Sequence, residues 1–418
     1  MRRNGVSNAI ATGLFVAGIL IGLTGYYVAA TFQTKATTQT GTVTQIETTT
    51  AGLTIRETVT VTPLKCGSAI TSDTTLNANV GPCSGDGLVI DASGITLDCA
   101  GHSVIGNGKE VAGAWINLTG AGIDLSDVRK ATVEDCYVTG FASGFDLVNS
   151  SGDTLTGNAA TNETGDGFDL SGSSGDTFIN NTAHDNAVVG FYLFESSGNT
   201  FRVNIADNNS NCGFDLDTSS GDTLTMNTAT DNSLAGFVFL DSSNNNALSE
   251  NTASSNGWGF GLEGGVNNTF SGNRANSNGY GFNLGEGLNA GANNTLSGNI
   301  ADNNTEYGFY LYPSFNNNTL TGNTADGNSD NGFQLWTSSS NTLTKNTADR
   351  NGGDGFYLSV SPSNTLTGNT ADGNIKYGYY DTTTGTGTKG TANYYSDDEC
   401  SGNGVRGSNP SGLGSPQP

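Results

Sequence analysis

Residues 341–363 read NTLTKNTADRNGGDGFYLSVSPS, and this stretch contains the pattern that decides the fold. Alternating polar and apolar residues predict three short strands, at Thr342–Thr344, around Thr347–Ala348 and at Gly355–Leu358. The Asn, Gly and Ser residues between them are typical of turns. Because successive side chains of a strand point to opposite faces, four apolar side chains are expected to point inward: Leu343, Ala348, Phe356 and Leu358. The stretch therefore predicts one coil of three strands.

The same pattern recurs along the chain with a period of 23 residues and small slips. Landmark glycines, each before an apolar residue, are Gly122, Gly144, Gly167, Gly190, Gly213, Gly236, Gly259, Gly281, Gly308, Gly332, Gly355 and Gly378. A first asparagine column contains Asn158, Asn181, Asn204, Asn227, Asn251, Asn273, Asn299, Asn323, Asn346 and Asn369. A second asparagine column contains Asn186, Asn209, Asn232, Asn256, Asn278, Asn304, Asn328, Asn351 and Asn374. Such regular recurrence indicates stacked units.

Stacked coils predict an all-β fold, a single-stranded right-handed parallel β-helix of about 12 coils with three parallel sheets. Adjacent rungs of such a solenoid lie about 4.8 Å apart. Asparagine amides stacked in register can form hydrogen bonds along their columns, and one Phe per coil is expected to stack in the core. We expect an N-terminal cap with the first coils over 64–121, regular repeats over 122–382, and a C-terminal cap and tail over 383–418.

The N-terminal region predicts a different organisation. Two arginines lie in a short segment, 1–8, expected to be cytoplasmic, and the uncharged stretch 9–30 is long enough to cross the ~30 Å hydrocarbon core as a transmembrane helix. The alternative is a cleaved signal peptide, because small residues at Val28–Ala30 offer a cleavage site. The Thr-rich segment 31–63 is expected to form an extended extracellular stalk. The bulk of the chain would then lie outside the cell, anchored to the cell membrane or secreted.

The charge of the chain excludes one class of partner. Its 418 residues have a net charge of −24 and include only 15 Lys and Arg. Affinity for nucleic acids depends on basic side chains that neutralise phosphates, so no nucleic-acid partner is expected. An acidic and weakly hydrophobic chain fits a solvated exterior surface and would also suit cation binding.

Several segments resemble a known family. CGSAIT at 66–71, ITLDCAGH at 95–102 and the NTLTGNTADGN coil at 364–374 resemble the NosD-type β-helix repeat proteins of prokaryotic cell envelopes, and the resemblance extends over 64–418. It implies the pectate-lyase-like β-helix fold. Lyases, hydrolases, epimerases and carbohydrate-binding surface proteins share that fold, so the resemblance leaves the chemistry open.

NosD itself is associated with copper-site assembly, which raises the question of a copper site. Copper prefers His, Met and Cys ligands. The His and Met residues of this chain fall on widely separated rungs and do not predict such a site: His102, His184, Met1 and Met226.

Two classes of function are consistent with the sequence. The first is a cell-surface structural or binding module that recognises carbohydrate, either a polysaccharide or a cell-envelope glycan. The second is a Ca²⁺-dependent polysaccharide lyase, or a glycoside hydrolase or epimerase, acting on an acidic polysaccharide. Catalysis would need clustered carboxylates, and the candidates are Asp169, Asp215 and Asp217 on the outer face of the Gly-Phe strands. We favour binding, because no basic residue accompanies them and the Asp-Pro-His-Asp pattern of the epimerases is absent.

An aromatic series marks the last coils. Positions two and four residues after each landmark glycine are expected to face outward. Near the C-terminus these positions hold the candidate carbohydrate-binding residues Tyr310, Tyr312, Trp336, Tyr357 and Tyr380. Exposed rings about one rung apart would form a flat apolar strip on which sugar rings can lie. The alternative is a ladder of rings that only stabilises the sheet.

Carboxylates in one turn column suggest a calcium site. Asp153, Asp176 and Asp222 recur in SSGDT segments of this column. Carboxylates on adjacent rungs repel each other, and Ca²⁺ would relieve that repulsion. The alternative is that each Asp caps backbone groups of its own turn. No other cofactor is expected.

Disulfides are expected only in the N-terminal part. Cys66 and Cys83 flank a short cap segment and are expected to pair. Cys99 and Cys136 end similar strands about one rung apart, which allows either a disulfide or two stacked thiols. The two remaining cysteines lie some seven rungs apart, too far to pair: Cys212 and Cys400.

Sequons predict N-glycosylation of a chain that lies outside the cell. The acceptor residues are Asn117, Asn149, Asn162, Asn180, Asn208, Asn267, Asn293, Asn303 and Asn317. Asn-rich repeats also generate sequons by chance, so both interpretations stay open.

Overall fold

The structure is a computed structural model that describes residues 46–50, 53–57, 64–108, 110–111, 114–115, 120–285 and 291–415. The chain divides into two compact units, Met1–Leu64 and Lys65–Pro418. In the first unit, β1 (Ile46–Thr50) pairs antiparallel with β2 (Leu53–Glu57), so the expected stalk includes a strand pair. Segments 1–8 and 9–30, the latter the expected transmembrane helix, lie outside the described residues. Within the described ranges, no helix is long and apolar enough to cross a membrane.

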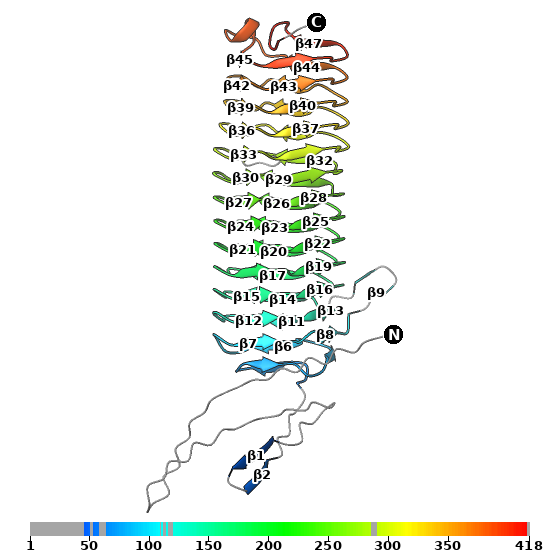
Figure 1. Ribbon diagram of the computed structural model, residues 1–418, viewed down its shortest axis with the longest axis vertical. Coiled ribbons are helices and arrows are strands. Elements are labelled where there is room, and N and C mark those ends of the chain that lie inside the picture. The colour runs from blue at the N-terminus through cyan, green and yellow to red at the C-terminus, as the bar shows by residue number, and fades with distance from the viewer. Residues whose placement is uncertain are drawn as a thin grey trace, which may run out of the picture. The chain divides into compact units, whose positions relative to one another are not determined.

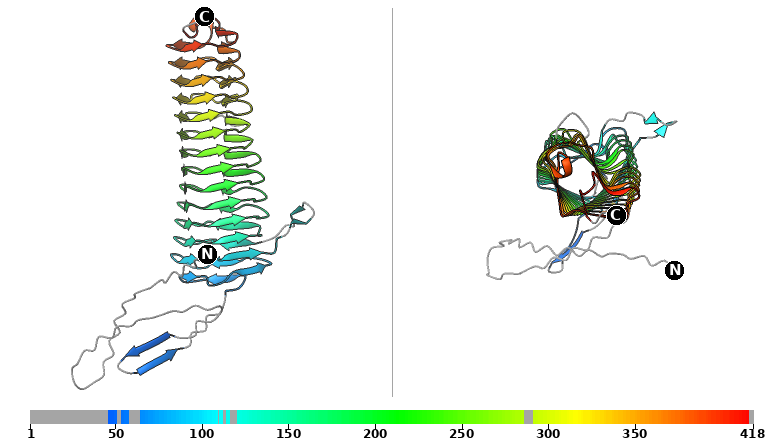
Figure 2. Two further views of the ribbon diagram at one scale, coloured as in Figure 1. Left: turned by 45° about the vertical axis from the view of Figure 1, so that its right-hand side comes forward. Right: turned by 90° about the horizontal axis from the view of Figure 1, so that it is seen from above.

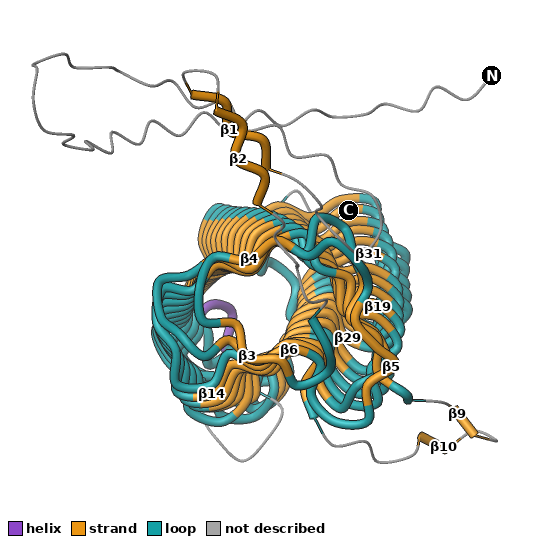
Figure 3. Tube along the Cα trace, turned by 90° about the horizontal axis from the view of Figure 1, so that it is seen from below, coloured by secondary structure: helices purple, strands orange, loops and turns teal. Residues whose placement is uncertain are grey.

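The second unit is a right-handed parallel β-solenoid in which each regular coil contributes one strand to each of three parallel sheets (Figures 1 and 3). Sheet I has 15 strands in the described chain: β3 (Ser68–Ile70), β6 (Leu88–Ile90), β11 (Ala121–Asp124), β14 (Ser143–Val148), β17 (Phe168–Ser171), β20 (Phe191–Phe194), β23 (Cys212–Asp217), β26 (Ala235–Leu240), β29 (Trp258–Glu263), β32 (Tyr280–Leu284), β35 (Phe309–Leu311), β38 (Phe333–Trp336), β41 (Phe356–Ser359), β44 (Tyr377–Asp381) and β47 (Arg406–Asn409).

Sheets II and III have 14 described strands each. Sheet II contains β4 (Thr74–Thr75), β7 (Thr96–Asp98), β12 (Thr132–Glu134), β15 (Thr154–Thr156), β18 (Thr177–Ile179), β21 (Thr200–Arg202), β24 (Thr223–Thr225), β27 (Ala247–Ser249), β30 (Thr269–Ser271), β33 (Thr295–Ser297), β36 (Thr319–Thr321), β39 (Thr342–Thr344), β42 (Thr365–Thr367) and β45 (Tyr394–Ser396). Sheet III contains β5 (Val80–Cys83), β8 (Ser103–Gly106), β13 (Tyr137–Thr139), β16 (Ala159–Thr161), β19 (Thr182–His184), β22 (Ile205–Asp207), β25 (Thr228–Thr230), β28 (Thr252–Ser254), β31 (Arg274–Asn276), β34 (Ile300–Asp302), β37 (Thr324–Asp326), β40 (Thr347–Asp349), β43 (Thr370–Asp372) and β46 (Glu399–Ser401).

Few elements interrupt this regularity (Figure 2). β9 (Glu110–Val111) pairs antiparallel with β10 (Ala114–Trp115) outside the three sheets, and a short 3₁₀ helix, η1 (Thr388–Gly390), lies near the C-terminus. The predicted all-β parallel solenoid with three sheets is confirmed. The solenoid is longer than the dozen coils expected, because the segments assigned to the two caps, 64–121 and 383–418, also contribute strands to the sheets.

The core is thin and repeats in every regular coil. In the coil that defines the repeat, Leu343, Ala348, Phe356 and Leu358 are all completely buried, as predicted. The inward Phe rings of sheet I stack along the axis from Phe145 to Phe356 and onto Tyr379, with centroids 4.6–5.0 Å apart. Parallel, in-register pairing therefore places identical side chains on top of each other.

The landmark glycines are required by close packing. A Cβ atom added at Gly213 would lie 2.7 Å from the carbonyl oxygen of Gly236 and 2.9 Å from the Cβ of Ala229. Distances this short leave no room for a side chain between adjacent coils. The Gly before each Phe therefore allows the backbone at this point of sheet I to pack directly against the small Ala side chains of sheet III.

Both predicted asparagine columns are confirmed as hydrogen-bonded ladders. The backbone N–H and Nδ2 of Asn181 donate to Oδ1 of Asn204 in the next coil, at 2.9 and 3.1 Å. The same Nδ2 also donates to the carbonyl of Leu155, at 2.8 Å. A further buried column, at the turn before sheet II, contains Asp153, Asp176, Asn199, Asp222, Asn246, Asn268, Asn294, Asn318, Asn341, Asn364 and Asn393. These ladders satisfy buried backbone groups at the turns.

Candidate functional site

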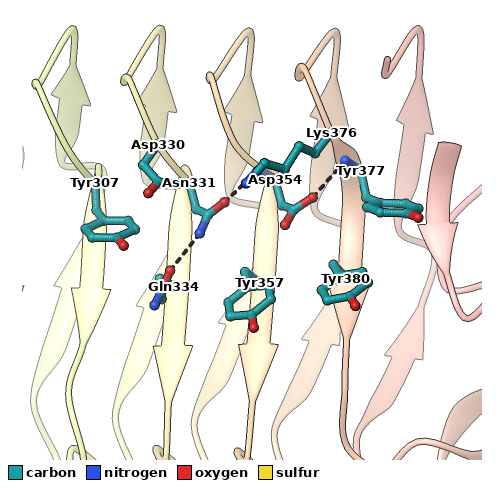
Figure 4. A pocket seen from close by; sticks show the side chains of 9 residues that line it. All are labelled: Tyr307, Asp330, Asn331, Gln334, Asp354, Tyr357, Lys376, Tyr377 and Tyr380. Carbon is teal, nitrogen blue, oxygen red and sulfur yellow. Dashed lines mark hydrogen bonds between the residues drawn. The ribbon is translucent and has the colours of Figure 1, made fainter. Parts of the chain in front are cut away.

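A surface pocket of about 490 Å³ lies along sheet I at the level of β35, β38, β41 and β44 (Figure 4). We call it the tyrosine pocket. Its lining residues are Tyr307, Asp330, Asn331, Gln334, Asp354, Tyr357, Lys376, Tyr377 and Tyr380. It combines aromatic rings with amides, two carboxylates and one amine in the last regular coils.

Two neighbouring columns of sheet I position these side chains. Gln334, Tyr357 and Tyr380 each lie two residues after a landmark glycine and are paired in register on β38, β41 and β44. The second column consists of the residues directly before Gly308 and directly before these three glycines, which are Tyr307, Asn331, Asp354 and Tyr377. Because the repeat aligns equivalent residues in successive coils, both columns run along the solenoid axis.

Aromatic rings line both ends of the tyrosine pocket (Figure 4). At the C-terminal end, the rings of Tyr357 and Tyr380 are parallel within 7° with centroids 5.4 Å apart, and Tyr377 lies 5.1 Å from Tyr380. At the other end, the ring of Tyr307 lies 4.9 Å from that of Tyr310. Between them lie polar side chains, so a ligand in the pocket would meet aromatic groups on two sides.

Hydrogen bonds fix the polar groups between the rings. Asn331 Nδ2 donates to Gln334 Oε1 at 2.6 Å, and Asn331 Oδ1 accepts the backbone N–H of Asp354 at 2.6 Å. Asp354 Oδ1 in turn accepts the backbone N–H of Tyr377 at 2.8 Å. Because Gln334 uses its oxygen toward Asn331, its Nε2 group remains available as a donor on the other side.

The tyrosine pocket is acidic. Burial raises the pKa of Asp354 above its ordinary value, against the opposing effects of the Tyr377 N–H and of Lys376. Burial, and then the Asp330 carboxylate, raise the pKa of Tyr307 to about 12. The Tyr307 hydroxyl therefore stays protonated at neutral pH.

The structure differs from the predicted aromatic strip. Tyr357 and Tyr380 do line the pocket, but Tyr310 is only 6% exposed, because its ring packs against Tyr312 at 4.1 Å and against Tyr307. Tyr310 pairs in register with Gln334, which separates the aromatic residues of this column. Trp336 is 45% exposed but does not line the pocket. The expected continuous strip is thus two tyrosine groups with an amide between them.

Sequence reasoning missed the second column and the loop before it. Tyr307, Asn331, Asp354 and Tyr377 directly precede landmark glycines, and Asp330 and Lys376 are two residues before them. A signal was present, because this position changes from small or apolar residues in the middle coils to Trp258 and Tyr280 in β29 and β32. Aligning the coils at that position would have identified the column.

The carboxylates predicted as catalytic candidates lie further toward the N-terminus on sheet I. Asp215 and Asp217 share β23, whereas Tyr192 separates them from Asp169 in the register of the sheet. Asp215 is 7% exposed, and burial, followed by nearby carboxylates that include Asp217, raises its pKa to about 7. Burial and the neighbouring Asp166 raise the pKa of Asp169 to about 6. The group is therefore a set of partly buried acids.

The predicted calcium ligands face the core. Asp153, Asp176 and Asp222 are completely buried, and each Oδ1 accepts a backbone N–H from the preceding coil. Burial is the main cause that raises their pKa values, to about 6, 7 and 7. In the described part of the chain, no group of three or more His, Cys, Asp or Glu is placed to hold a metal ion. This arrangement matches the alternative, capping of backbone groups, with the caps directed to the neighbouring coil.

The cysteines follow the predicted geometry. Disulfides join Cys66 to Cys83 and Cys99 to Cys136. The other two are buried in different sheets, on β23 and β46: Cys212 and Cys400.

The sequons occupy surface turns between the strands of the solenoid. Asn117 lies outside the described residues. The other eight acceptors are exposed and have a positive φ of 53° to 60°: Asn149, Asn162, Asn180, Asn208, Asn267, Asn293, Asn303 and Asn317. Asparagine tolerates this left-handed conformation better than most residues.

Comparisons with known proteins agree with this architecture. The profile of the right-handed β-helix region matches residues 64–229 and 121–275, and that of the periplasmic copper-binding protein NosD matches 262–406. The chain belongs to the right-handed β-helix family. Within it, the chain is a β-helix repeat protein of the NosD type. A search of curated proteins finds no match.

Three solved structures are similar to this chain at low identity. The periplasmic alginate epimerase AlgG is 14% identical, with 76% of each chain covered and a TM-score of 0.44. The A-module of the Azotobacter vinelandii mannuronan C-5 epimerase AlgE6 is 15% identical, with 83% of this chain and 89% of that chain covered and a TM-score of 0.37. The catalytic domain of a GH87 α-1,3-glucanase is 13% identical, with 84% and 61% covered and a TM-score of 0.33. At these identities the likeness concerns the fold alone.

The described residues do not fit a copper site. His184 is flanked by the carboxylates of Asp185 and Asp207, at 2.8 and 3.3 Å. His102 lies before β8, three coils away, and Met226 is an exposed turn residue after β24. Met1 lies outside the described chain. Copper sites need His, Met or Cys ligands side by side, and the described residues do not bring His102, His184 and Met226 together.

Proposed function

We propose that this protein binds carbohydrate through the tyrosine pocket. One observation supports this most directly. The partly exposed rings of Tyr357 and Tyr377 both pack on the ring of Tyr380. The hydrogen-bonded amides of Asn331 and Gln334 line the same pocket. Sugar rings have apolar faces that pack on aromatic rings and hydroxyls that bond to amides and carboxylates, so the two kinds of group match the two sides of a sugar.

The repeat also suits a linear ligand. Equivalent residues of neighbouring coils are about 4.8 Å apart, so the lining of the tyrosine pocket, over four coils, extends about 14 Å along the axis. A chain of sugars lying along the solenoid would meet Tyr307 first and the group around Tyr380 last. The binding mode is therefore expected to involve several consecutive sugar units.

The test is a double substitution, Tyr357→Ala with Tyr380→Ala. Both rings are partly exposed on the outer face, so the variant should fold but lose retention in affinity electrophoresis through gels that contain polysaccharide. Tyr137→Ala is the matched control, because Tyr137 is exposed on β13 in sheet III, away from the pocket. Unchanged retention of the double variant would contradict the proposal.

We also place the protein outside the cytoplasm. Two disulfides support this location, since such bonds persist in oxidising compartments, and the matching NosD profile is described as periplasmic. Attachment to the cell membrane through 9–30, as the sequence suggests, belongs to the same proposal. Cell fractionation combined with protease accessibility of the intact cell surface tests both statements.

A second candidate function is cleavage or epimerisation of a polysaccharide on sheet I. The observation that favours it is the raised pKa of Asp215, about 7, beside Asp217 on the same strand. A carboxyl that is still protonated near neutral pH can act as a general acid. Incubation with polyuronates and neutral glycans, with and without Ca²⁺, followed by ultraviolet absorption and reducing-end assays, would detect such activity. Asp215→Asn should abolish it.

A further inference from the structure

We infer that the tyrosine pocket selects glycans without carboxylate groups and disfavours polyuronates. This inference rests on the proposed carbohydrate-binding function and names the class of ligand. Three ionisable groups other than tyrosines line the pocket, namely Asp330, Asp354 and Lys376. Two negative charges thus face one positive charge.

The amine of Lys376, which lines the pocket, already has the carboxyl group of Asp354 as a partner of opposite charge. Lys376 acts electrostatically on Asp354, and the two residues lie at the same side of the pocket (Figure 4). A uronate carboxylate that approached Lys376 would have to compete with this internal partner. The Asp330 carboxylate, which also lines the pocket, would remain and would repel a second carboxylate.

Charges outside the pocket act in the same direction. Glu306 also contributes to the negative field at Tyr307. The whole chain has a net charge of −24, so a polyanion meets repulsion before it reaches the surface. Hydroxyl groups, by contrast, match the lining, because carboxylates and amide oxygens accept from a hydroxyl and the Gln334 Nε2 donates to it.

The test compares neutral glycans with polyuronates on the full chain. The probes are a soluble neutral β-glucan, a galactomannan, alginate and polygalacturonate, each in affinity electrophoresis and in titration calorimetry. We expect at least tenfold tighter binding of one of the neutral polymers than of either polyuronate. Raising the salt from about 0.01 M to about 0.1 M shortens the Debye length from about 30 Å to about 10 Å and should strengthen any residual polyuronate binding, because it screens repulsion.

Asp330→Asn isolates the local charge. The amide has nearly the same size and shape as the carboxylate, and the loss of one negative charge should raise affinity for polyuronates several-fold. Asp127→Asn is the control, because it removes the same charge from an exposed turn near the other end of the solenoid and should change nothing. Melting curves of all variants verify folding.

Three outcomes are distinguishable. Preference for neutral polymers, with a specific effect of Asp330→Asn, supports the inference. Polyuronate binding that is as tight as neutral binding and weakens with salt overturns it, while leaving the carbohydrate-binding function in place. Retention of neither class of polymer overturns the proposed function itself.

Discussion

The Oδ1 atom of Asn204 accepts two hydrogen bonds from Asn181, one from the backbone N–H at 2.9 Å and one from Nδ2 at 3.1 Å. Replacing Asn204 by Ala would leave this buried N–H and the carbonyl of Phe178 without their partner. Each unsatisfied buried group costs about 1–3 kcal/mol, so Asn204→Ala should destabilise the solenoid by about 2–5 kcal/mol in urea unfolding. Thr223 is exposed on β24, so the free energy of unfolding of Thr223→Ala should stay within about 0.5 kcal/mol of the wild-type value. Equal midpoints for both variants would contradict the ladder model.

The buried carboxyl group of Asp176 is expected to make the free energy of unfolding fall as the pH rises, which is unusual for an Asp. Burial raises its pKa from the ordinary value of about 3.9 to about 7 in the folded state. The stability that its proton contributes is therefore complete below the unfolded pKa and is lost as the pH rises through the folded pKa. Asp176→Asn keeps the Oδ1 acceptor without the buried charge. We expect it to raise stability by roughly 2 kcal/mol at about pH 8 and to change it little at about pH 4.

The reciprocal substitution provides the control for this prediction. Asn199→Asp introduces a carboxylate between Asp176 and Asp222 in the same column. It should lower the urea midpoint strongly at about pH 8 and less at about pH 4, since a protonated Asp resembles Asn. Urea titrations of the three proteins across this range would reveal whether the column binds protons. Parallel curves at all pH values would show that it does not.

Gly213→Ala tests the close approach of adjacent coils. The new Cβ would lie 2.7 Å from the carbonyl oxygen of Gly236, and backbone atoms cannot yield as a flexible side chain can. We expect a loss of about 1–3 kcal/mol or more. Gly85→Ala is a matched control, because a Cβ there meets nothing within 4 Å. Similar thermal melting of both variants would argue against close packing as the role of the landmark glycines.

Tyr310 and Trp336 should behave oppositely when each is replaced by Ala. Tyr310 is buried among the rings of Tyr307 and Tyr312, so its loss should destabilise the protein by about 3–5 kcal/mol. Trp336→Ala should leave both melting and polysaccharide retention close to wild type, because its exposed ring is not part of the tyrosine pocket. If Trp336→Ala abolishes retention, the binding face extends beyond the pocket.

Glycosylation is the prediction that depends on the host. Eight sequon asparagines are exposed at left-handed turns, so all are accessible to a transferase. We expect the intact mass of the native protein to exceed that of the bare chain by whole glycan units. Treatment with a peptide-N-glycosidase should remove the excess and convert the acceptors to Asp. A native mass equal to that of the bare chain would contradict this prediction.

The sequence predicted the coil because the inward residues repeat. Leu343 and Phe356 occupy positions that are apolar in nearly every coil. Asn204 belongs to a buried column whose regular spacing can be recognised in the sequence. In-register stacking turns such one-dimensional regularity into contacts, so the strands, the Phe stack and the ladders could be predicted without knowledge of the loops.

The candidate site depends on residues that do not repeat. Tyr310 was expected to be exposed, but it is covered by Tyr307 and Tyr312, and the coil from Gly281 to Gly308 is 27 residues long instead of 23. Asp176 was expected in a turn column that could bind Ca²⁺, but its side chain is completely buried. In both cases the alternation of side chains along a strand predicts the face of the sheet to which a residue points. Whether that residue is exposed depends on the neighbouring turns and rings, which differ from coil to coil.

The asparagine ladders also give the solenoid an electrical direction. Their Nδ2 groups donate to the next coil toward the C-terminus, so the amide dipoles add up along the axis much as peptide dipoles do in an α-helix. Two of the series finish on an acid: Asn369 donates to Asp398 at 2.8 Å, and Asn393 donates to Asp381 at 2.9 Å. Negative charge thus lies at the positive pole. The two ends of the molecule are therefore chemically unequal: whole coils can be inserted between them, but removing the C-terminal end would expose the positive pole of each series.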